Sequence, residues 1–361
     1  MKEKIGAAVI GFGGMGTWHA QTLAIHMDDR FNCVGSFDID PDRQEAAEDS
    51  DIIAYESREA LLSDPAIELV VVATPNDVHK EIVIDALRHG KHVVCEKPVT
   101  MRLVDYEEMV AVAQECGLLF TVHQNRRWDP DYLTAKEVFD SNTLGRVYNI
   151  ESRVHGSRGI PGDWRNTKEH GGGMVYDWGI HMLDQMLEMM GERRLLSLYC
   201  QLTFVTNEHV DDGFRVICNF EDDITFVVEI MTSNFISLPR WYINGENGTA
   251  VIHDWDISGE IVKVSDWENR DAVPIQAGMG ITKTMAPRTP DTIKSYPLPE
   301  EFTQKEFLDN IRYYYENIYD VLRNGAKPYV TYDQQRRLLR LVEAMFISGK
   351  ENKSIELERK G

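Results

Sequence analysis

The feature that most constrains the fold is a glycine-rich turn close to the N-terminus. An apolar run at residues 7–10 leads into it, and a helical pattern begins at Thr17. One glycine permits the tight turn, a second lets the backbone approach a pyrophosphate, and a third lets helix and strand pack closely. The helix N-terminus then faces the anion. We therefore predict a dinucleotide site built from Gly11, Phe12, Gly13, Gly14, Met15 and Gly16.

Apolar runs and helical patterns alternate over the first third of the chain. The runs fall at residues 7–10, 32–37, 68–73, 92–95 and 118–122, and helical stretches at 78–89 and 104–116 each run into a glycine. The third run is apolar throughout, as in a strand that is covered on both faces. The series predicts an α/β domain at residues 1–123, a Rossmann fold with a doubly wound parallel sheet.

Beyond this point the pattern changes to consecutive strands. A strand at 145–156 and a helix at 174–190 precede alternating runs at 196–206, 213–220 and 224–231, and a hairpin is marked by Asn244-Gly245-Glu246-Asn247-Gly248. Strands without intervening helices predict an α+β domain at residues 124–330 with a large, open, mainly antiparallel sheet. The exposed face of such a sheet commonly packs on a partner subunit, so we expect a homo-oligomer, either a dimer or a tetramer.

Two further segments complete the chain. Residues 270–300 contain five prolines and show no periodicity. They are predicted to form a long loop or arm that covers the site or reaches a neighbouring subunit. Helical patterns follow at 303–323 and 333–348. The C-terminal helix and tail, residues 331–361, are expected to pack back on the Rossmann domain.

The composition limits the kinds of partner that the protein is expected to bind and the compartment in which it is expected. With 38 basic and 59 acidic residues among 361, the net charge of −21 disfavours nucleic acid and anionic membranes as partners. No stretch approaches the ~18 consecutive apolar residues of a membrane helix, and the N-terminus lacks the apolar segment of a secretory signal. The five cysteines form no Cys-x-x-Cys pair, so we expect free thiols, no metal site and a cytoplasmic location.

The end of the second strand bears on the choice of cofactor. Asp38 stands there, where a carboxylate accepts hydrogen bonds from the ribose 2′-hydroxyl and repels a 2′-phosphate. This favours NAD over NADP, although Arg43 nearby weakens the preference. Asp40 competes for the role, but it precedes Pro41 and is interpreted as a helix cap.

Residues after the third and fourth strands complete the predicted dinucleotide site, because ligands bind at the carboxyl ends of parallel strands. An ordinary proline turn is the alternative interpretation of the segment after the third strand. The expected cofactor contacts in these segments are Thr74, Pro75, Asn76, His79, Glu96 and Lys97.

Two segments carry the candidate chemistry. Lys97, in a Glu-Lys-Pro sequence at the end of the fourth strand, is predicted to lie beside the nicotinamide end, where it can position a hydroxyl or exchange a proton. On the second segment, Asp177 and His181 are four residues apart and share one face of a helix, as do His181 and Asp184. A carboxylate beside an imidazole raises its basicity. A surface lysine, a surface Asp-His pair and a metal half-site are the alternatives.

These motifs together resemble the Gfo/Idh/MocA oxidoreductases, which include glucose–fructose oxidoreductase and inositol dehydrogenases. The resemblance rests on the glycine turn, the Glu-Lys-Pro sequence and the run Gly-Gly-Gly-x-x-x-Asp-x-Gly-x-His-x-x-Asp at 171–184, and it covers nearly the whole chain. It implies that Lys97, Asp177 and His181 are catalytic. The run at 123–129 is also similar to members that oxidise sugars and inositols.

Polar and aromatic residues around the catalytic helix are candidates for a polyol pocket, because polyols favour bidentate donors and a flat apolar face. For each, a structural role is the alternative. They are Arg127, His155, Arg158, Trp164, Arg165 and Tyr176. Trp255 and Trp267 are instead expected to pack in the sheet.

The sequence therefore predicts an NAD-dependent dehydrogenase that transfers hydride between the nicotinamide and a secondary hydroxyl of a sugar or cyclic polyol. Two alternatives remain. One is a glycosidase or lyase that uses NAD transiently with no net redox change, and the other is a non-catalytic NAD-binding regulator. The presence of all three catalytic residues argues against the regulator.

Overall fold

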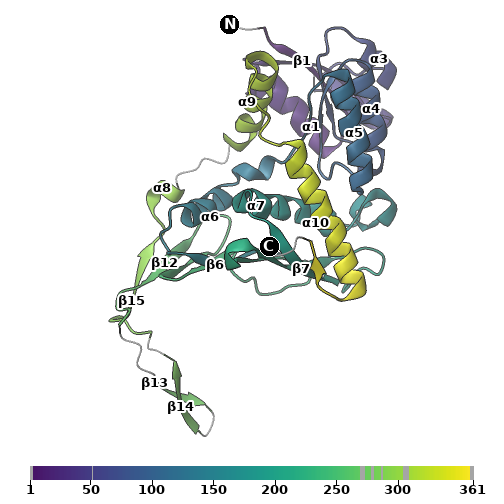
Figure 1. Cartoon of the computed structure of the whole chain (residues 1–361). Coiled ribbons are helices and arrows are strands. Elements are labelled where there is room, and N and C mark those ends of the chain that lie inside the picture. Colours follow the sequence, from purple (N-terminus) through teal and green to yellow (C-terminus); the bar gives the residue numbers. More distant parts are fainter. Residues whose placement is uncertain are drawn as a thin grey trace.

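A computed structural model gives the architecture (Figure 1) and describes residues 3–50, 52–268, 273–277, 280–285, 288–303 and 309–357. The N-terminal domain is built on a five-stranded parallel sheet in the order β2-β1-β3-β4-β5. Its strands are β1 (Ile5–Ile10), β2 (Phe31–Phe37), β3 (Leu69–Val72), β4 (His92–Cys95) and β5 (Phe120–Val122). Every residue of β3 is buried, as predicted for a strand covered on both faces.

Helices connect these strands and end where the sequence predicts. Gly117 adopts the left-handed conformation at the end of α5, with φ of 66°. Asp40 caps α2 by accepting from the amide of Asp42, which confirms its interpretation as a cap. The connections comprise α1 (Gly14–Gln21), η1 (Thr22–His26), α2 (Pro41–Glu48), α3 (Arg58–Ser63), η2 (Asn76–Val78), α4 (His79–Arg88) and α5 (Leu103–Cys116).

The second domain is built on a nine-stranded sheet in the order β15-β12-β11-β10-β6-β9-β8-β7-β16. All neighbours are antiparallel except β6 and β9, because the β7-β8-β9 meander returns alongside β6 in the same direction. The predicted hairpin is present between β10 and β11. The strands are β6 (Val147–His155), β7 (Leu195–Thr203), β8 (Gly213–Phe220), β9 (Thr225–Met231), β10 (Trp241–Gly245), β11 (Gly248–Ile252), β12 (Gly259–Val264), β15 (Ile293–Pro297) and β16 (Ile355–Glu356).

Helices α6 and α7 lie on the face of this sheet that is turned toward the Rossmann domain (Figure 1). The predicted helix at 174–190 consists of a π-helical turn, η6 (Val175–Gly179), that continues into α7 (Ile180–Met190). The other helical segments here are η3 (Asn125–Trp128), α6 (Pro130–Asp140), η4 (Trp164–Asn166), η5 (Lys168–His170), η7 (Glu221–Asp223) and α8 (Glu300–Thr303).

The last two helices join the domains. Tyr314 and Tyr315 of α9 (Asp309–Asn324) are buried in the Rossmann core, although the predicted boundaries place this segment in the second domain. Helix α10 (Tyr332–Glu351), which opens with a capping box at Thr331, contributes Leu339 to the Rossmann core and Met345 to the second core. The C-terminal helix therefore packs on both domains.

The proline-containing segment, predicted as a long loop or arm, contains a strand pair that the sequence did not indicate. β13 (Val273–Ala277) and β14 (Gly280–Met285) pair as a hairpin that projects away from the body as an arm (Figure 1). Strand β15 joins the large sheet. Pro274 lies where the hairpin register shifts, a position at which a strand tolerates proline. The remaining residues of 269–287 lie outside the described part of the chain.

The structure also shows the state of the cysteines and the hydropathy of the helices. All five cysteines fall within the described ranges and are free. Every helix in the described residues is too short or too polar to span a bilayer.

Candidate active site

The β1–α1 turn has the geometry of a dinucleotide cradle. Gly11 has φ of 92°, and a Cβ on Gly16 would lie 1.8 Å from the carbonyl oxygen of Gly11, so both positions require glycine. Helix α1 begins without a side-chain cap or an acidic residue in its first turn. Its first amides therefore remain available to an anion. A Cβ on Gly14 would meet open space, which leaves room for a bound group.

Asp38 connects the second strand to this turn. Its Oδ2 accepts from the amide of Phe12 at 2.6 Å and lies 3.4 Å from Nη1 of Arg43, and its Oδ1 accepts from the amide of Asp40. The carboxylate is buried at the edge of the cradle. Met15 is exposed, whereas Phe12 is buried. The predicted residues around the glycine turn are therefore adjacent.

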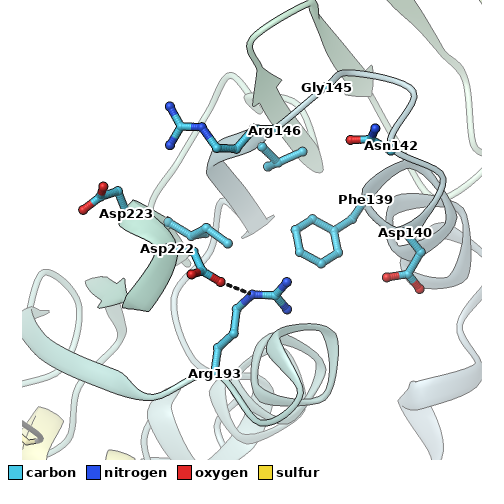
Figure 2. A pocket seen from close by; sticks show the side chains of 10 residues that line it. Phe139, Asp140, Asn142, Gly145, Arg146, Arg193, Asp222 and Asp223 are labelled. Atoms are coloured by element: carbon cyan, nitrogen blue, oxygen red, sulfur yellow. Dashed lines mark hydrogen bonds and ion pairs between the residues drawn. The ribbon is translucent and has the colours of Figure 1, made fainter. Parts of the chain in front are cut away.

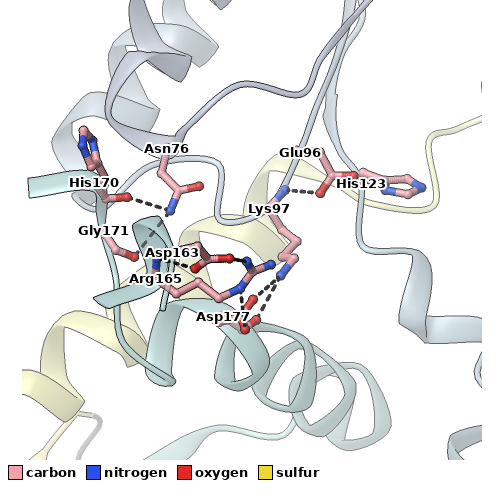
Figure 3. Close-up of polar contacts among 9 residues, drawn as sticks. All are labelled: Asn76, Glu96, Lys97, His123, Asp163, Arg165, His170, Gly171 and Asp177. Atoms are coloured by element: carbon pink, nitrogen blue, oxygen red, sulfur yellow. Dashed lines mark hydrogen bonds and ion pairs between the residues drawn. The ribbon is translucent and has the colours of Figure 1, made fainter. Parts of the chain in front are cut away.

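Some polar side chains of the segment after β3 form hydrogen bonds within the protein. The side-chain amide of Asn76 donates to the carbonyls of His170 and Gly171, which links the Rossmann domain to the second domain (Figure 3). His79 is buried between the carbonyls of Thr74 and Pro98, so it braces the backbone and does not face the cradle. The hydroxyl of Thr74 is buried and has no hydrogen-bond partner among the described residues.

The two candidate catalytic segments converge although they are far apart in the chain. Nζ of Lys97 donates to the carbonyl oxygen of Asp177 at 3.1 Å and to its Oδ1 at 3.2 Å (Figure 3). Nε of Arg165 donates to Oδ2 of the same carboxylate at 3.1 Å. Asp177 therefore holds the amine from the end of β4 against the helix that begins with η6.

His181 lies one α7 turn further along, and the predicted Asp177–His181 pair does not form. The carboxylate bonds Lys97 and Arg165 instead, because the π-turn alters the spacing by which residues four apart share a helix face. Burial, followed by the charges of Lys97 and Arg126, holds the pKa of His181 well below its usual range. Its Nδ1 is buried with no partner among the described residues. The imidazole is therefore neutral and has capacity for a ligand.

A network that the sequence did not reveal supports Lys97 from behind. Oε1 of Glu96 accepts from Nε2 of His19 at 2.8 Å and from Nδ1 of His123 at 2.7 Å, and Oε2 accepts from the amide of Lys97. The hydroxyl of Tyr315 lies 2.6 Å from Nδ1 of His19. Glu96, predicted to contact the cofactor, is buried and positions the lysine backbone.

The charges of this network follow from its partners. Burial alone would raise the pKa of Glu96, but His123 and His19 hold it well below its usual range. Burial lowers the pKa of His19 to about 4. The ligand atoms of His19, Glu96 and His123 lie within 4.8 Å of one another, which is compatible with a metal. The separations of 2.7 and 2.8 Å are instead those of hydrogen bonds.

A pocket of about 380 Å³ opens beside the carboxylate of Asp177. It is lined by Val154, His155, Gly156, Gly159, Pro161, Met174, Asp177, Trp178, Ile230, Met231, Thr232 and Trp255. His155, predicted to contact substrate, lines this pocket, and its Nε2 donates to Glu229. Trp255 and Trp267 are both half exposed, so their prediction as sheet packing is wrong. Both follow strand ends in loops that carry no periodic signal.

Other predicted pocket residues lie elsewhere. Arg127 is buried in a bidentate ion pair with Asp184, at 2.7 Å to each oxygen, so its predicted substrate role is not supported. The hydroxyl of Tyr176 donates to the carbonyl of Met101, and the ring faces a different pocket. Trp164 lies under the guanidinium of Arg165. Arg158 is exposed.

A larger hollow of about 620 Å³ lies where α6, the start of β6 and the β8–β9 turn meet (Figure 2). Arg193 donates to Asp222 across it at 3.2 Å. None of the predicted site residues lines this hollow. Its larger volume is therefore no reason to place the active site there and not near Lys97, Asp177 and His181.

Comparisons with known proteins agree with this geometry. Residues 5–124 match the family model described as an oxidoreductase family with an NAD-binding Rossmann fold, and residues 132–251 match a GFO/IDH/MocA C-terminal domain. The chain is similar to an NAD-binding protein from Listeria innocua, with 44% identity, a TM-score of 0.92, and coverage of 99% of this chain and 100% of that structure.

Two curated relatives match over most of their length. An uncharacterised oxidoreductase from Schizosaccharomyces pombe is 31% identical, with 85% of this chain and 86% of the relative covered. A scyllo-inositol 2-dehydrogenase (NADP(+)) from Bacillus subtilis is 29% identical, with 83% and 82% covered. The chain therefore belongs to the Gfo/Idh/MocA family of oxidoreductases, whose N-terminal domain is an NAD-binding Rossmann fold.

Proposed function

We propose that the protein is an NAD-dependent dehydrogenase that oxidises a secondary hydroxyl of a sugar or cyclic polyol. The observation that carries this is the contact of Lys97 with Asp177, whose carboxylate lines a pocket, while burial and the nearby charge of Lys97 lower the pKa of His181. The inositol-oxidising relative supports the substrate class. The reaction is reversible in principle, and the residues serve both directions.

Each side chain has a distinct task in this proposal. Neutral His181 accepts the proton of the substrate hydroxyl, and its lowered pKa keeps it a base at pH values below the ordinary 6.5. The Lys97 ammonium donates a hydrogen bond to the same oxygen as the carbonyl forms. Asp177 holds Lys97 in place through two contacts. Nicotinamide, when bound, supplies the hydride acceptor or donor.

The cofactor preference rests on Asp38. Its buried carboxylate at the edge of the cradle supports a contact with the ribose 2′-hydroxyl and disfavours a 2′-phosphate. The scyllo-inositol 2-dehydrogenase relative is named for NADP(+), so Asp38 is the residue on which the preference for NAD has to be tested. Arg43, half exposed and 3.4 Å from the carboxylate, is the residue that would favour NADP.

The location and assembly also remain proposals. We place the enzyme in the cytoplasm, in keeping with its five free thiols. We place the contact between subunits on the sheet face opposite α6 and α7. Light scattering of the purified protein would show a monomer if this contact does not form.

The direct test is a panel of inositols, hexoses, glycosides and anhydrosugars supplied with NAD or NADP. The expected result is accumulation of reduced nicotinamide, followed by its absorbance, with at least one neutral polyol or sugar. Substrate cleavage without reduced cofactor would favour the transient-oxidation alternative. Cofactor binding without turnover of any panel member would favour the regulator and contradict the proposal.

A further inference from the structure

Five side chains form a layered column that leads from the second core to the catalytic helix. The guanidinium of Arg240 lies between two rings, 5.0 Å from the centroid of Trp241 and 4.4 Å from that of Trp255. The rings of Trp255 and Trp178 are tilted by 47° with centroids 5.8 Å apart, so they meet at an angle and not face to face. The guanidinium of Arg126 lies 4.3 Å from the centroid of Trp178. We call this set the arginine–tryptophan column.

The column is fixed at both ends. Arg240 is buried, with Nε 3.0 Å from Asp131 and Nη1 donating to Ser152 at 2.8 Å. The indole of Trp241 is fully buried and also donates to Asp131. At the other end Arg126 donates to Asp129 at 2.9 Å. Trp178 and Trp255 are therefore held in place before any ligand arrives, which lowers the entropic cost of binding against them.

One part of the column is open to solvent. Trp255 is 47% exposed, and with Trp178 it lines the pocket that contains Asp177. A half-exposed tryptophan that stacks on a buried guanidinium offers a flat apolar surface at low entropic cost. The C–H face of a sugar ring matches such a surface, while its hydroxyls remain free to bond elsewhere.

The charges of the residues that line the pocket limit the chemical class of the ligand. Among the described residues that line this pocket there is no lysine or arginine, and its carboxylate belongs to Asp177. His155, also in the lining, already donates to Glu229. The arginines of the column lie behind the rings, bonded to carboxylates. Two further cations, Lys97 and Arg165, are paired with the carboxylate of Asp177. The described lining around the two rings therefore offers no unpaired cation to a phosphate or a carboxylate.

We propose that Trp255 and Trp178 form a stacking subsite for the C–H face of a neutral, unphosphorylated pyranose ring. The inference rests on the proposed function and deepens it, because it names the substrate class as neutral pyranosides. Nucleotide sugars, sugar phosphates and sugar acids are excluded from the class.

The test compares Trp255→Ala with Trp267→Ala, a second half-exposed tryptophan of the same domain that does not line the pocket. The probes are methyl glucopyranoside, cellobiose, glucose 6-phosphate and glucuronate, measured by calorimetric binding to the NAD-loaded protein and by steady-state kinetics. Trp255→Ala is expected to raise Kd and KM for the neutral pyranosides about tenfold, with kcat within about twofold. Trp255→Phe should recover most of the loss, and Trp267→Ala should match the unaltered protein.

The outcomes separate this inference from the proposed function. Binding of pyranosides that depends on Trp255, without reduction of NAD, would leave the subsite standing and remove the dehydrogenase. Turnover of pyranosides that is equally insensitive to both tryptophan variants would overturn the subsite. Tighter binding of glucose 6-phosphate or glucuronate than of the neutral sugars would overturn the assigned class. No binding of any probe would overturn the subsite, while the proposed function would still be decided by the wider panel that includes inositols.

Discussion

The two sides of the crevice are built in different ways. On the Rossmann side, backbone groups form the cradle, and a Cβ at Gly16 would collide with the Gly11 carbonyl at 1.8 Å. On the substrate side, the pocket is assembled from side chains of β6, η6, β9 and the segment after β11. A backbone site requires residues that are contiguous in sequence, whereas a side-chain site does not. The backbone site can therefore be recognised as a sequence motif, whereas the side-chain site can be recognised only once the fold is known.

The largest effect of a substitution is expected at Lys97, where the two sides of the crevice meet. Lys97→Ala is expected to lower kcat by about 10²–10⁴, because the amine that polarises the carbinol oxygen is lost. The Kd for NAD should change less than about twofold, since the cradle is backbone. Stopped-flow kinetics and fluorescence titration measure the two quantities.

Lys136→Ala is the matched control, because Lys136 pairs with Asp140 on the surface of α6. It should alter neither quantity. Equal losses of NAD affinity and kcat in Lys97→Ala would show that the lysine serves the cofactor and not the chemistry.

Arg127 and Arg165 are both predicted from the sequence to bind substrate, but substitutions at the two positions are expected to have different effects. Arg127→Ala leaves the carboxylate of Asp184 buried without its bidentate partner, at a cost of about 3–5 kcal/mol in the free energy of unfolding. Arg165 is 30% exposed and bonds Asp177, so Arg165→Ala should spare stability and lower kcat/KM about tenfold. Urea unfolding with kinetics on both variants decides this. A stable Arg127→Ala with a raised KM would restore its predicted substrate role.

The backbone side can be tested with adjacent glycines. Gly16→Ala forces a Cβ against the Gly11 carbonyl and should lower the free energy of unfolding by about 1–3 kcal/mol. Gly14→Ala points into open space and should leave stability unchanged. Thermal melts without cofactor measure both. Equal melting temperatures would contradict the close helix–strand packing at this turn.

The smallest predicted effect concerns cofactor choice. Asp38→Ala should lower the ratio of kcat/KM for NAD over NADP about tenfold, the value of one lost hydrogen bond to a charged group. Asp40→Ala, the neighbouring helix cap, is the control and should leave the ratio unchanged. An unaltered ratio in Asp38→Ala would place ribose recognition elsewhere.

How much the sequence could predict depends on the same distinction. The alternation of strands and helices and the cradle follow from patterns whose physics is local. The association of Lys97 with Asp177, 80 residues away, is expected only from the family resemblance. The roles of Glu96 and Arg127 do not follow from local patterns, because their partners His19 and Asp184 are 77 and 57 residues away. Trp255 could not be placed, because a loop residue carries no periodicity that shows which way it faces.

The most direct test of the central claim, that Lys97 and His181 act on one carbinol beside the nicotinamide, is isotope transfer. A panel substrate deuterated at the reacting carbon is turned over by the holoenzyme, and the cofactor is recovered for mass spectrometry. We expect one deuterium in the reduced nicotinamide, and a rate of transfer that is about 10²–10⁴-fold lower in Lys97→Ala and in His181→Ala at matched enzyme concentration. Reduced cofactor without deuterium, or undiminished transfer in either variant, would contradict the claim.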